Sequence, residues 1–168
     1  MKKLICILLV LCCFGSLVGC SSKNTPPENS VMVYYKRDKA TYGAADSIIA
    51  TCYMDTTNFS PNYSYVLERY LRSTPDAGFV SPYPDNLSLI NFKLEGLTAK
   101  VVLGDNIADL TGIDLTIALT CLTQTIMSLT GCHEVIISAV SKQLDGQNFI
   151  TLSRDSFLLL DNSGSPAD

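Results

Sequence analysis

The side chains that could act as acids, bases or nucleophiles are few in this chain and lie far apart in it. The one histidine, His133, precedes Glu134, but neighbouring residues of a strand point to opposite faces, so this carboxylate cannot orient the imidazole. General base catalysis needs a partner within hydrogen-bond reach. No serine nucleophile elbow, zinc-protease motif or phosphate-binding glycine loop occurs. The sequence therefore predicts a protein that is not an enzyme, with His133 at the surface near a helix C-terminus.

Three aspartates, Asp105, Asp109 and Asp114, gather in one short stretch. A calcium loop needs oxygen ligands at alternate positions around a sharp glycine turn, and this spacing does not provide them. Asp114 suits the first turn of a helix instead. We therefore expect no metal and no cofactor.

Four of the seven cysteines fall within the first 20 residues, which leaves Cys52, Cys121 and Cys132. Their spacing matches no zinc pattern. A helix between Cys121 and Cys132 would hold them about 16 Å apart, too far for a disulfide. A bond between Cys52 and Cys132 stays open if strands bring them together. We favour three small buried hydrophobic residues.

The first 19 residues have the layout of an export signal: a basic start at Lys2 and Lys3, then an apolar run too short to span a bilayer comfortably. The run ends in Leu17-Val18-Gly19-Cys20, which looks like the lipobox of bacterial lipoproteins. That resemblance implies that the chain is cut before Cys20 and that the Cys20 sulfur receives a diacylglycerol. The alternative is an ordinary cleaved signal with a chance cysteine. With acyl chains on Cys20, the protein would be anchored to the cell membrane on its extracytoplasmic face.

Removing a 19-residue leader from 168 residues leaves 149, enough for one domain with a core. Residues 20–30 read as the lipidated cysteine and a flexible tether, 31–161 as a single domain and 162–168 as a tail. Without Lys2 and Lys3, ten basic side chains stand against 16 acidic ones, a formal charge of −6. This acidic balance disfavours nucleic acid as a partner and gives no attraction to anionic lipids, so the acyl chains must supply the attachment.

The best-specified element is a helix from Thr111 to Gly131. Its apolar residues recur at spacings of four and three, which places them on one face: Leu115, Leu119, Leu122, Ile126 and Leu129. Thr111 can cap the first turn, with Asp114 three residues on, and Gly131 suits a left-handed C-cap. The β-branched run 135–140 predicts a buried strand directly afterwards.

Other segments are typical of shorter elements. Residues 31–35 and 47–54 predict strands, and Ser60-Pro61 predicts the cap and first turn of a second helix. The proline-rich segment 74–85 predicts a loop. Ile90, Phe92 and Leu94 alternate with other residues before a turn at Gly96, which predicts a hairpin with one buried face. Residues 149–152 and 157–160 predict short closing strands.

Several of these segments together resemble the GerMN domain, which occurs in spore-germination, sporulation and other envelope lipoproteins of bacteria. They are Val-Leu-Glu-Arg-Tyr-Leu at 66–71, the segment 78–85, the hairpin 90–103, the helix 115–129 and the strand through Ile137. The resemblance covers about residues 31–146, with one copy where spore-germination members carry two.

The resemblance implies an α+β fold: a small mixed or antiparallel sheet with two helices on one face, in the order β-β-α-β-β-α-β, similar to ring-building motifs. It brings no catalytic motif that could be carried over to this chain. It favours a role in sporulation, germination or envelope assembly, through contacts with other envelope proteins or through self-association.

One face of the long helix is polar yet carries no charge, which is unusual for a solvated helix. Its residues are Thr116, Thr120, Thr123, Gln124 and Met127. We interpret it as a face for a partner protein, or else as a face covered by the chain's own segment 149–160. A second functional hypothesis is a module that binds peptidoglycan or wall sugars through tyrosines and the loop around Tyr83, which Pro82 and Pro84 flank.

Overall fold

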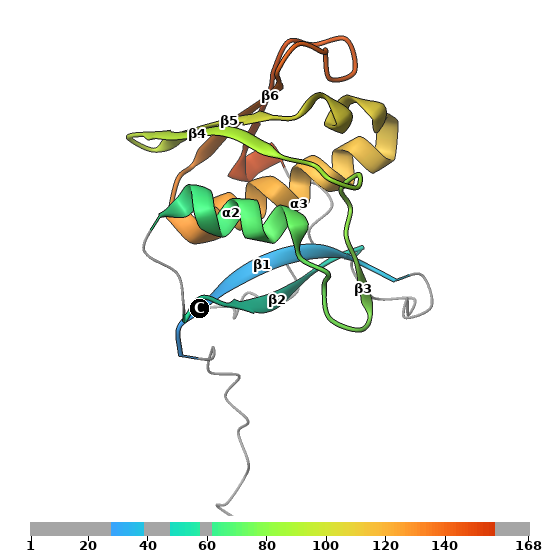
Figure 1. The fold of residues 1–168 in the computed structure, drawn as a ribbon. Helices are drawn as coiled ribbons and strands as arrows, with labels where there is room; N and C mark the ends of the chain where they lie inside the picture. The colour runs from blue at the N-terminus through green and yellow to red at the C-terminus, as the bar shows by residue number, and fades with distance from the viewer. Residues whose placement is uncertain (1–27, 39–47, 58–61, 157–168) are drawn as a thin grey trace, which may run out of the picture.

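The computed structural model describes residues 28–38, 48–57 and 62–156, which stack in three layers (Figure 1). A three-stranded sheet and a four-stranded sheet form the outer layers, and two α-helices lie between them. The elements, in chain order, are β1 (Ser30–Arg37), β2 (Ile49–Asp55), α2 (Tyr63–Arg72), β3 (Phe79–Val80), β4 (Leu89–Glu95), β5 (Thr98–Leu103), the 3₁₀ helix η2 (Asp105–Asp109), α3 (Gly112–Thr130), β6 (Glu134–Ala139), β7 (Ile150–Ser153) and the 3₁₀ helix η3 (Arg154–Ser156).

The two sheets differ in how their strands pair. The first has the order β2-β1-β3 and is antiparallel. The second has the order β4-β5-β6-β7, in which β5 and β6 run parallel and the other pairs are antiparallel. Parallel neighbours need a crossover connection, and α3 supplies it. The α+β class and the two helices on one face of a mixed sheet are as predicted.

The strands divide into two sheets where the sequence predicted one, and α3 explains why. This helix buries eleven of its 19 residues, and these lie on most of its circumference. A helix that is apolar nearly all round needs cover on both sides. The second sheet covers one side of the helix layer, and β1 packs along α3 on the other (Figure 1).

The ends of both helices partly match the predictions. Gly131 has φ +71° and its N–H bonds to the carbonyl of Met127, so the left-handed C-cap of α3 is confirmed. Thr111 is the N-cap residue of α3, but its side chain makes no capping hydrogen bond. The prediction of Ser60 as the cap of α2 was wrong: the helix begins at Tyr63, and the Asn62 side chain accepts the N–H of Ser64 at 3.0 Å.

The hairpin of β4 and β5 turns at Gly96, whose φ is +62°. Ile90 was expected on its buried face but is 54% exposed. The cause is a register shift between Leu89 and Asn91. Because a one-residue shift exchanges the two faces of a strand, Leu89 packs against the core in its place. The proline-rich segment also contains the short strand β3, where only a loop was predicted.

Candidate functional site

The uncharged face of α3 is mostly interior. Thr120, Thr123 and Met127 are buried, Gln124 is half-buried and Thr116 is exposed. The prediction of a partner face is therefore wrong for the three buried residues. Of the alternative cover, residues 149–160, the described part contains β7, which pairs with β6 in the sheet that covers one side of the helix layer, while residues 157–160 lie outside the described residues.

β1, which comes from the other end of the chain, packs along α3 on the side of Thr125, about 200° around the helix from Thr123. Its Tyr34 N–H donates to the hydroxyl of Thr125 on α3 at 3.0 Å. Thr116 and Thr120 donate their hydroxyls to carbonyls four residues earlier, on Gly112 and Thr116. This hydrogen bond satisfies the buried Thr120 hydroxyl within its own helix, so Thr120 needs no partner protein.

Several tyrosines considered for ligand binding form an internal cluster instead. The ring centroids of Tyr35 and Tyr70 lie 5.1 Å apart, and those of Tyr70 and Tyr83 lie 5.5 Å apart. The Tyr70 hydroxyl donates to the Tyr34 carbonyl and lies 2.7 Å from the Tyr83 hydroxyl. Burial raises the pKa of both Tyr70 and Tyr83 well above the ordinary tyrosine value, so both stay neutral. Tyr53, Tyr63 and Tyr65 remain at the surface.

A wide groove of about 790 Å³ lies beside the Tyr83 loop. The end of α2 and the segment from Thr74 through β3 to Asn86 line it. Its lining combines aromatic, proline, hydroxyl and charged side chains, among them Phe79, Pro75, Ser81, Arg72 and Asp85. This groove includes Tyr83 and Pro84 of the predicted ligand-binding loop.

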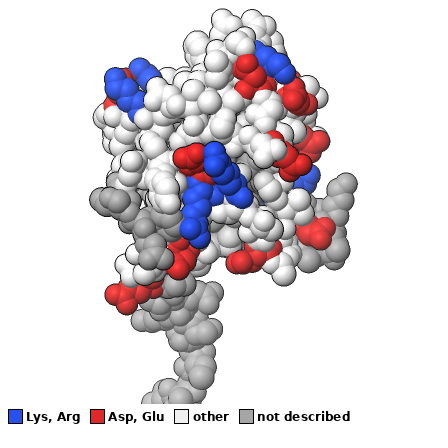
Figure 2. Space-filling model, in the orientation of Figure 1, with Lys and Arg blue, Asp and Glu red and all other residues white. Residues whose placement is uncertain are grey.

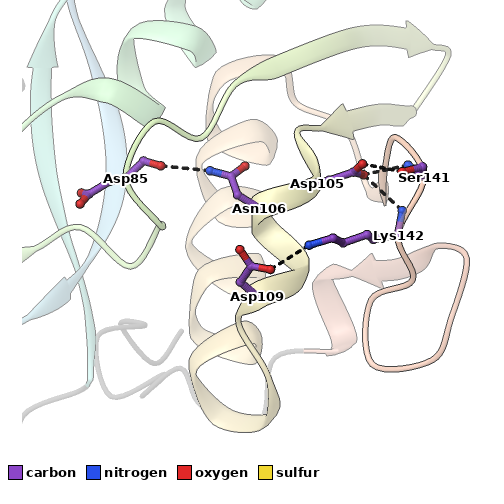
Figure 3. A network of polar contacts seen from close by, with 6 residues as sticks. All are labelled: Asp85, Asp105, Asn106, Asp109, Ser141 and Lys142. Carbon is purple, nitrogen blue, oxygen red and sulfur yellow. Dashed lines mark hydrogen bonds and ion pairs between the residues drawn. The ribbon is translucent and has the colours of Figure 1, made fainter.

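The side chains of Asp105 and Asp109 bind other groups of the protein itself. Asp105 accepts the backbone N–H groups of Ser141 and Lys142, at 2.8 and 3.2 Å, and also the Ser141 hydroxyl (Figure 3). Lys142 pairs with Asp109 at 2.9 Å, while Asn106 donates to the carbonyl of Asp85 at 3.0 Å (Figure 3). Hydrogen bonds from Ser141 lower the pKa of Asp105. This network ties η2 to the loop after β6 and to the segment before β4.

The remaining candidate groups lie apart. His133 is exposed, and its backbone N–H donates to the Leu97 carbonyl at 2.8 Å. Asp114 lies 3.5 Å from Lys36 across the surface. Among the described residues, no three acidic, histidine or cysteine side chains stand close enough to share a metal ion. On the face shown in Figure 2, Lys and Arg lie beside Asp and Glu in separate small groups, so that face carries no broad basic patch.

The cysteines of the domain carry free thiols: Cys121 and Cys132 are buried and Cys52 is half-buried. The open alternative of a bond between Cys52 and Cys132 is therefore not realised. Cys20 and the leader lie outside the described residues. By length and composition α3 could cross a membrane, but 61% of that stretch is buried inside the fold, as expected of a core helix.

Comparison with solved structures identifies the fold. The first GerMN domain of the sporulation protein GerM from Bacillus subtilis superposes with a TM-score of 0.58 at 16% identity, over 75% of this chain and 98% of that domain. The tandem GerMN domains of the same protein give a TM-score of 0.54 at 13% identity. The match covers 76% of this chain and 46% of the tandem structure. No family model matches the sequence, and neither does any curated protein.

This chain therefore has the fold of a GerMN domain, as the sequence resemblance implied. Identities of 13–16% establish the fold alone.

Proposed function

We propose that this chain is a non-enzymatic, lipid-anchored protein of the bacterial envelope whose GerMN-like domain serves as a protein–protein assembly scaffold. The fold that it shares with GerM is the observation that carries the proposal. Sporulation, germination and general envelope assembly are the settings in which such a scaffold would act.

The lipobox supports the anchor. Cys20 follows an apolar leader at the position where a lipidated cysteine belongs. Two acyl chains give stable membrane attachment, whereas one chain gives only marginal binding. The acidic balance of the mature chain adds no electrostatic attraction to anionic lipids. Attachment on the extracytoplasmic face thus depends on Cys20.

The anchor is tested by expressing the full chain and Cys20→Ser in bacteria fed labelled palmitate. The wild-type protein should carry label and sediment with membranes, and the variant should lose both properties. Cys52→Ser serves as the control, because it removes a thiol of the folded domain. Label that persists in Cys20→Ser would rule out this anchor.

The scaffold role is tested by cross-linking the anchored wild-type protein in intact cells and identifying the products. Specific adducts with envelope proteins or with a second copy are the expected result. Recovery of only the uncross-linked chain would count against a scaffold.

A second function, binding of peptidoglycan or wall sugars, is favoured by the groove beside the Tyr83 loop. Its hydroxyl-bearing and aromatic lining suits a sugar or a short peptide. Retention on purified peptidoglycan tests it, with Phe79→Ala and Ser81→Ala as groove variants. A pure scaffold would not be retained, and ligand binding would be lost in the groove variants.

A further inference from the structure

The four-stranded sheet ends at β4, and no other strand of the described chain covers its outer edge. An open strand edge presents backbone N–H and C=O groups that can pair with another strand. Glu95 and Thr98 flank the two-residue turn, so they form a hydrogen-bonded pair of the hairpin. From this pair onward, hydrogen-bonded and non-hydrogen-bonded pairs alternate along β4 and β5. Phe92 and Leu94 lie in non-hydrogen-bonded pairs, so their backbone N–H and C=O groups point away from β5.

The two halves of this edge differ. The register shift between Leu89 and Asn91 bends the first half, which is a common protection of an edge strand. The second half, from Phe92 to Glu95, pairs regularly with β5. A lysine on an edge strand usually opposes pairing with another chain. Here Lys93 is accompanied by Glu95 on the same face, at 2.6 Å, so this half carries both signs of charge.

We propose that β4 pairs with β4 of a second copy of this chain, antiparallel about Leu94, so that two four-stranded sheets join into one. This inference rests on the proposed scaffold function and identifies the surface through which copies associate. A two-fold axis makes such an interface self-complementary. The two Leu94 residues exchange backbone hydrogen bonds, and Lys93 of each copy lies opposite Glu95 of the other.

Charge complementarity selects this register. If Lys93 were the central residue, the two copies would place lysine opposite lysine. Centring on Leu94 creates two opposite-charge pairs, which stabilise neighbouring strands, whereas like charges directly opposite destabilise them. Lys100, which also pairs with Glu95 at 2.6 Å, lies one strand further in and does not face the second copy.

The same register accounts for large apolar side chains left uncovered. Ile90 and Leu97 are 54% and 58% exposed. Pairing about Leu94 places the turn between β4 and β5 of one copy, which carries Leu97, beside the Ile90 end of β4 in the other. A groove of about 260 Å³ between β4 and α2, lined by Ile90 and Tyr65, lies at this end of the strand. Tyr65 is 53% exposed, so the second copy would cover apolar surface from both elements.

Two charge reversals test the register. In Lys93→Glu, the introduced carboxylate would face Glu95 of the second copy, and in Glu95→Lys, the introduced ammonium group would face Lys93. Each variant alone should dimerise about tenfold more weakly or worse than the wild type, because two pairs change from attractive to repulsive. An equimolar mixture of the two should form a heterodimer, because every opposed pair is again of opposite charge.

The measurement uses the full chain in mild detergent, with mass followed by light scattering over a dilution series. Lys142→Glu is the matched control, since it makes the same charge change at the distant loop after β6 and should dimerise like the wild type. Thermal unfolding of every variant verifies that the fold is retained.

A wild type that stays monomeric throughout would overturn the strand pairing, as would a mixture that fails to associate. Equal weakening by Lys142→Glu would also overturn it. In those cases, adducts with other envelope proteins in the cellular cross-linking experiment would still support the scaffold function. Loss of both dimer and adducts would remove the scaffold function too.

Discussion

The hydroxyl oxygen of Thr125, in the middle of α3, accepts the backbone N–H of Tyr34 at 3.0 Å. The Tyr70 hydroxyl, on α2, donates to the backbone carbonyl of Tyr34. Further along the same strand, Lys36 and Arg37 pair with β3. Two helix side chains thus take the place of a neighbouring strand at Tyr34, and they connect the first sheet to the helix layer.

Thr125→Val should destabilise the protein by about 1–3 kcal/mol, because it leaves the partly buried Tyr34 N–H without an acceptor. Thr123→Val is the matched control. The Thr123 hydroxyl is buried and finds no partner among the described residues, so a methyl group in its place should be neutral or stabilising. Urea unfolding of both variants checks this pair. Equal effects from the two substitutions would contradict the assigned role of Thr125.

Tyr70→Phe should cost about 1–2 kcal/mol of unfolding free energy, since it removes the donor to the Tyr34 carbonyl and the contact with the Tyr83 hydroxyl. The ring and its packing are kept. Tyr63→Phe provides the comparison, because Tyr63 is 38% exposed and its ring packs edge-on against Phe92. Chemical denaturation should show a clear loss for the first variant and almost none for the second.

Asp105→Ala should lower the melting temperature more than Asp109→Ala does. Asp105 accepts two backbone N–H groups and a hydroxyl, whereas Asp109 makes one exposed ion pair with Lys142. The lowered pKa of Asp105 means that its contribution is present above the unfolded value of 3.8 and is lost as the pH falls through the folded value.

Acid titration of the melting temperature tests this pH dependence. The difference between the wild type and Asp105→Ala should shrink at the acid end. A difference that stays constant with pH would show that the carboxylate charge is irrelevant there.

Cys121 should make stability sensitive to alkali. Burial raises the pKa of its thiol from 9.0 to about 12. Because the folded pKa is the higher one, this contribution is complete below pH 9 and is lost as the pH rises toward about 12. The melting temperature should fall more steeply over that range for the wild type than for Cys121→Ala.

Cys52 should react with a thiol reagent before Cys121 does, because it is only half-buried. Burial raises the pKa of its thiol to about 11.

Local signals predicted most of the fold. The spacing of Leu115 to Leu129, the glycine at 131 and the turn at Gly96 each act within a few residues, and each holds in the structure. The prediction of where α2 starts was wrong because Asn62 caps the helix. The prediction that Ile90 faces the core was wrong because a single-residue bulge leaves no clear pattern in the sequence.

The candidate partner face shows what sequence could not provide. The missing charges between Thr116 and Thr130 correctly indicated a covered helix. One strand that packs on this helix, β1, comes from the other end of the chain: Tyr34 lies 91 residues from Thr125, and nothing in the helix itself specifies that pairing. The open edge of β4 was equally hidden, because strand order is set by contacts between distant segments.

The position of β1 also decides how the domain would bear force. Tension along a membrane tether would enter at Ser30, the first residue of β1, which pairs antiparallel with β2 from Ser30 opposite Asp55 to Lys36 opposite Ile49. A pull along that strand loads the whole ladder in shear, together with the hydrogen bonds at Tyr34, instead of opening pairs one after another. Such a tether would therefore end in a strand that a full antiparallel ladder holds in the fold.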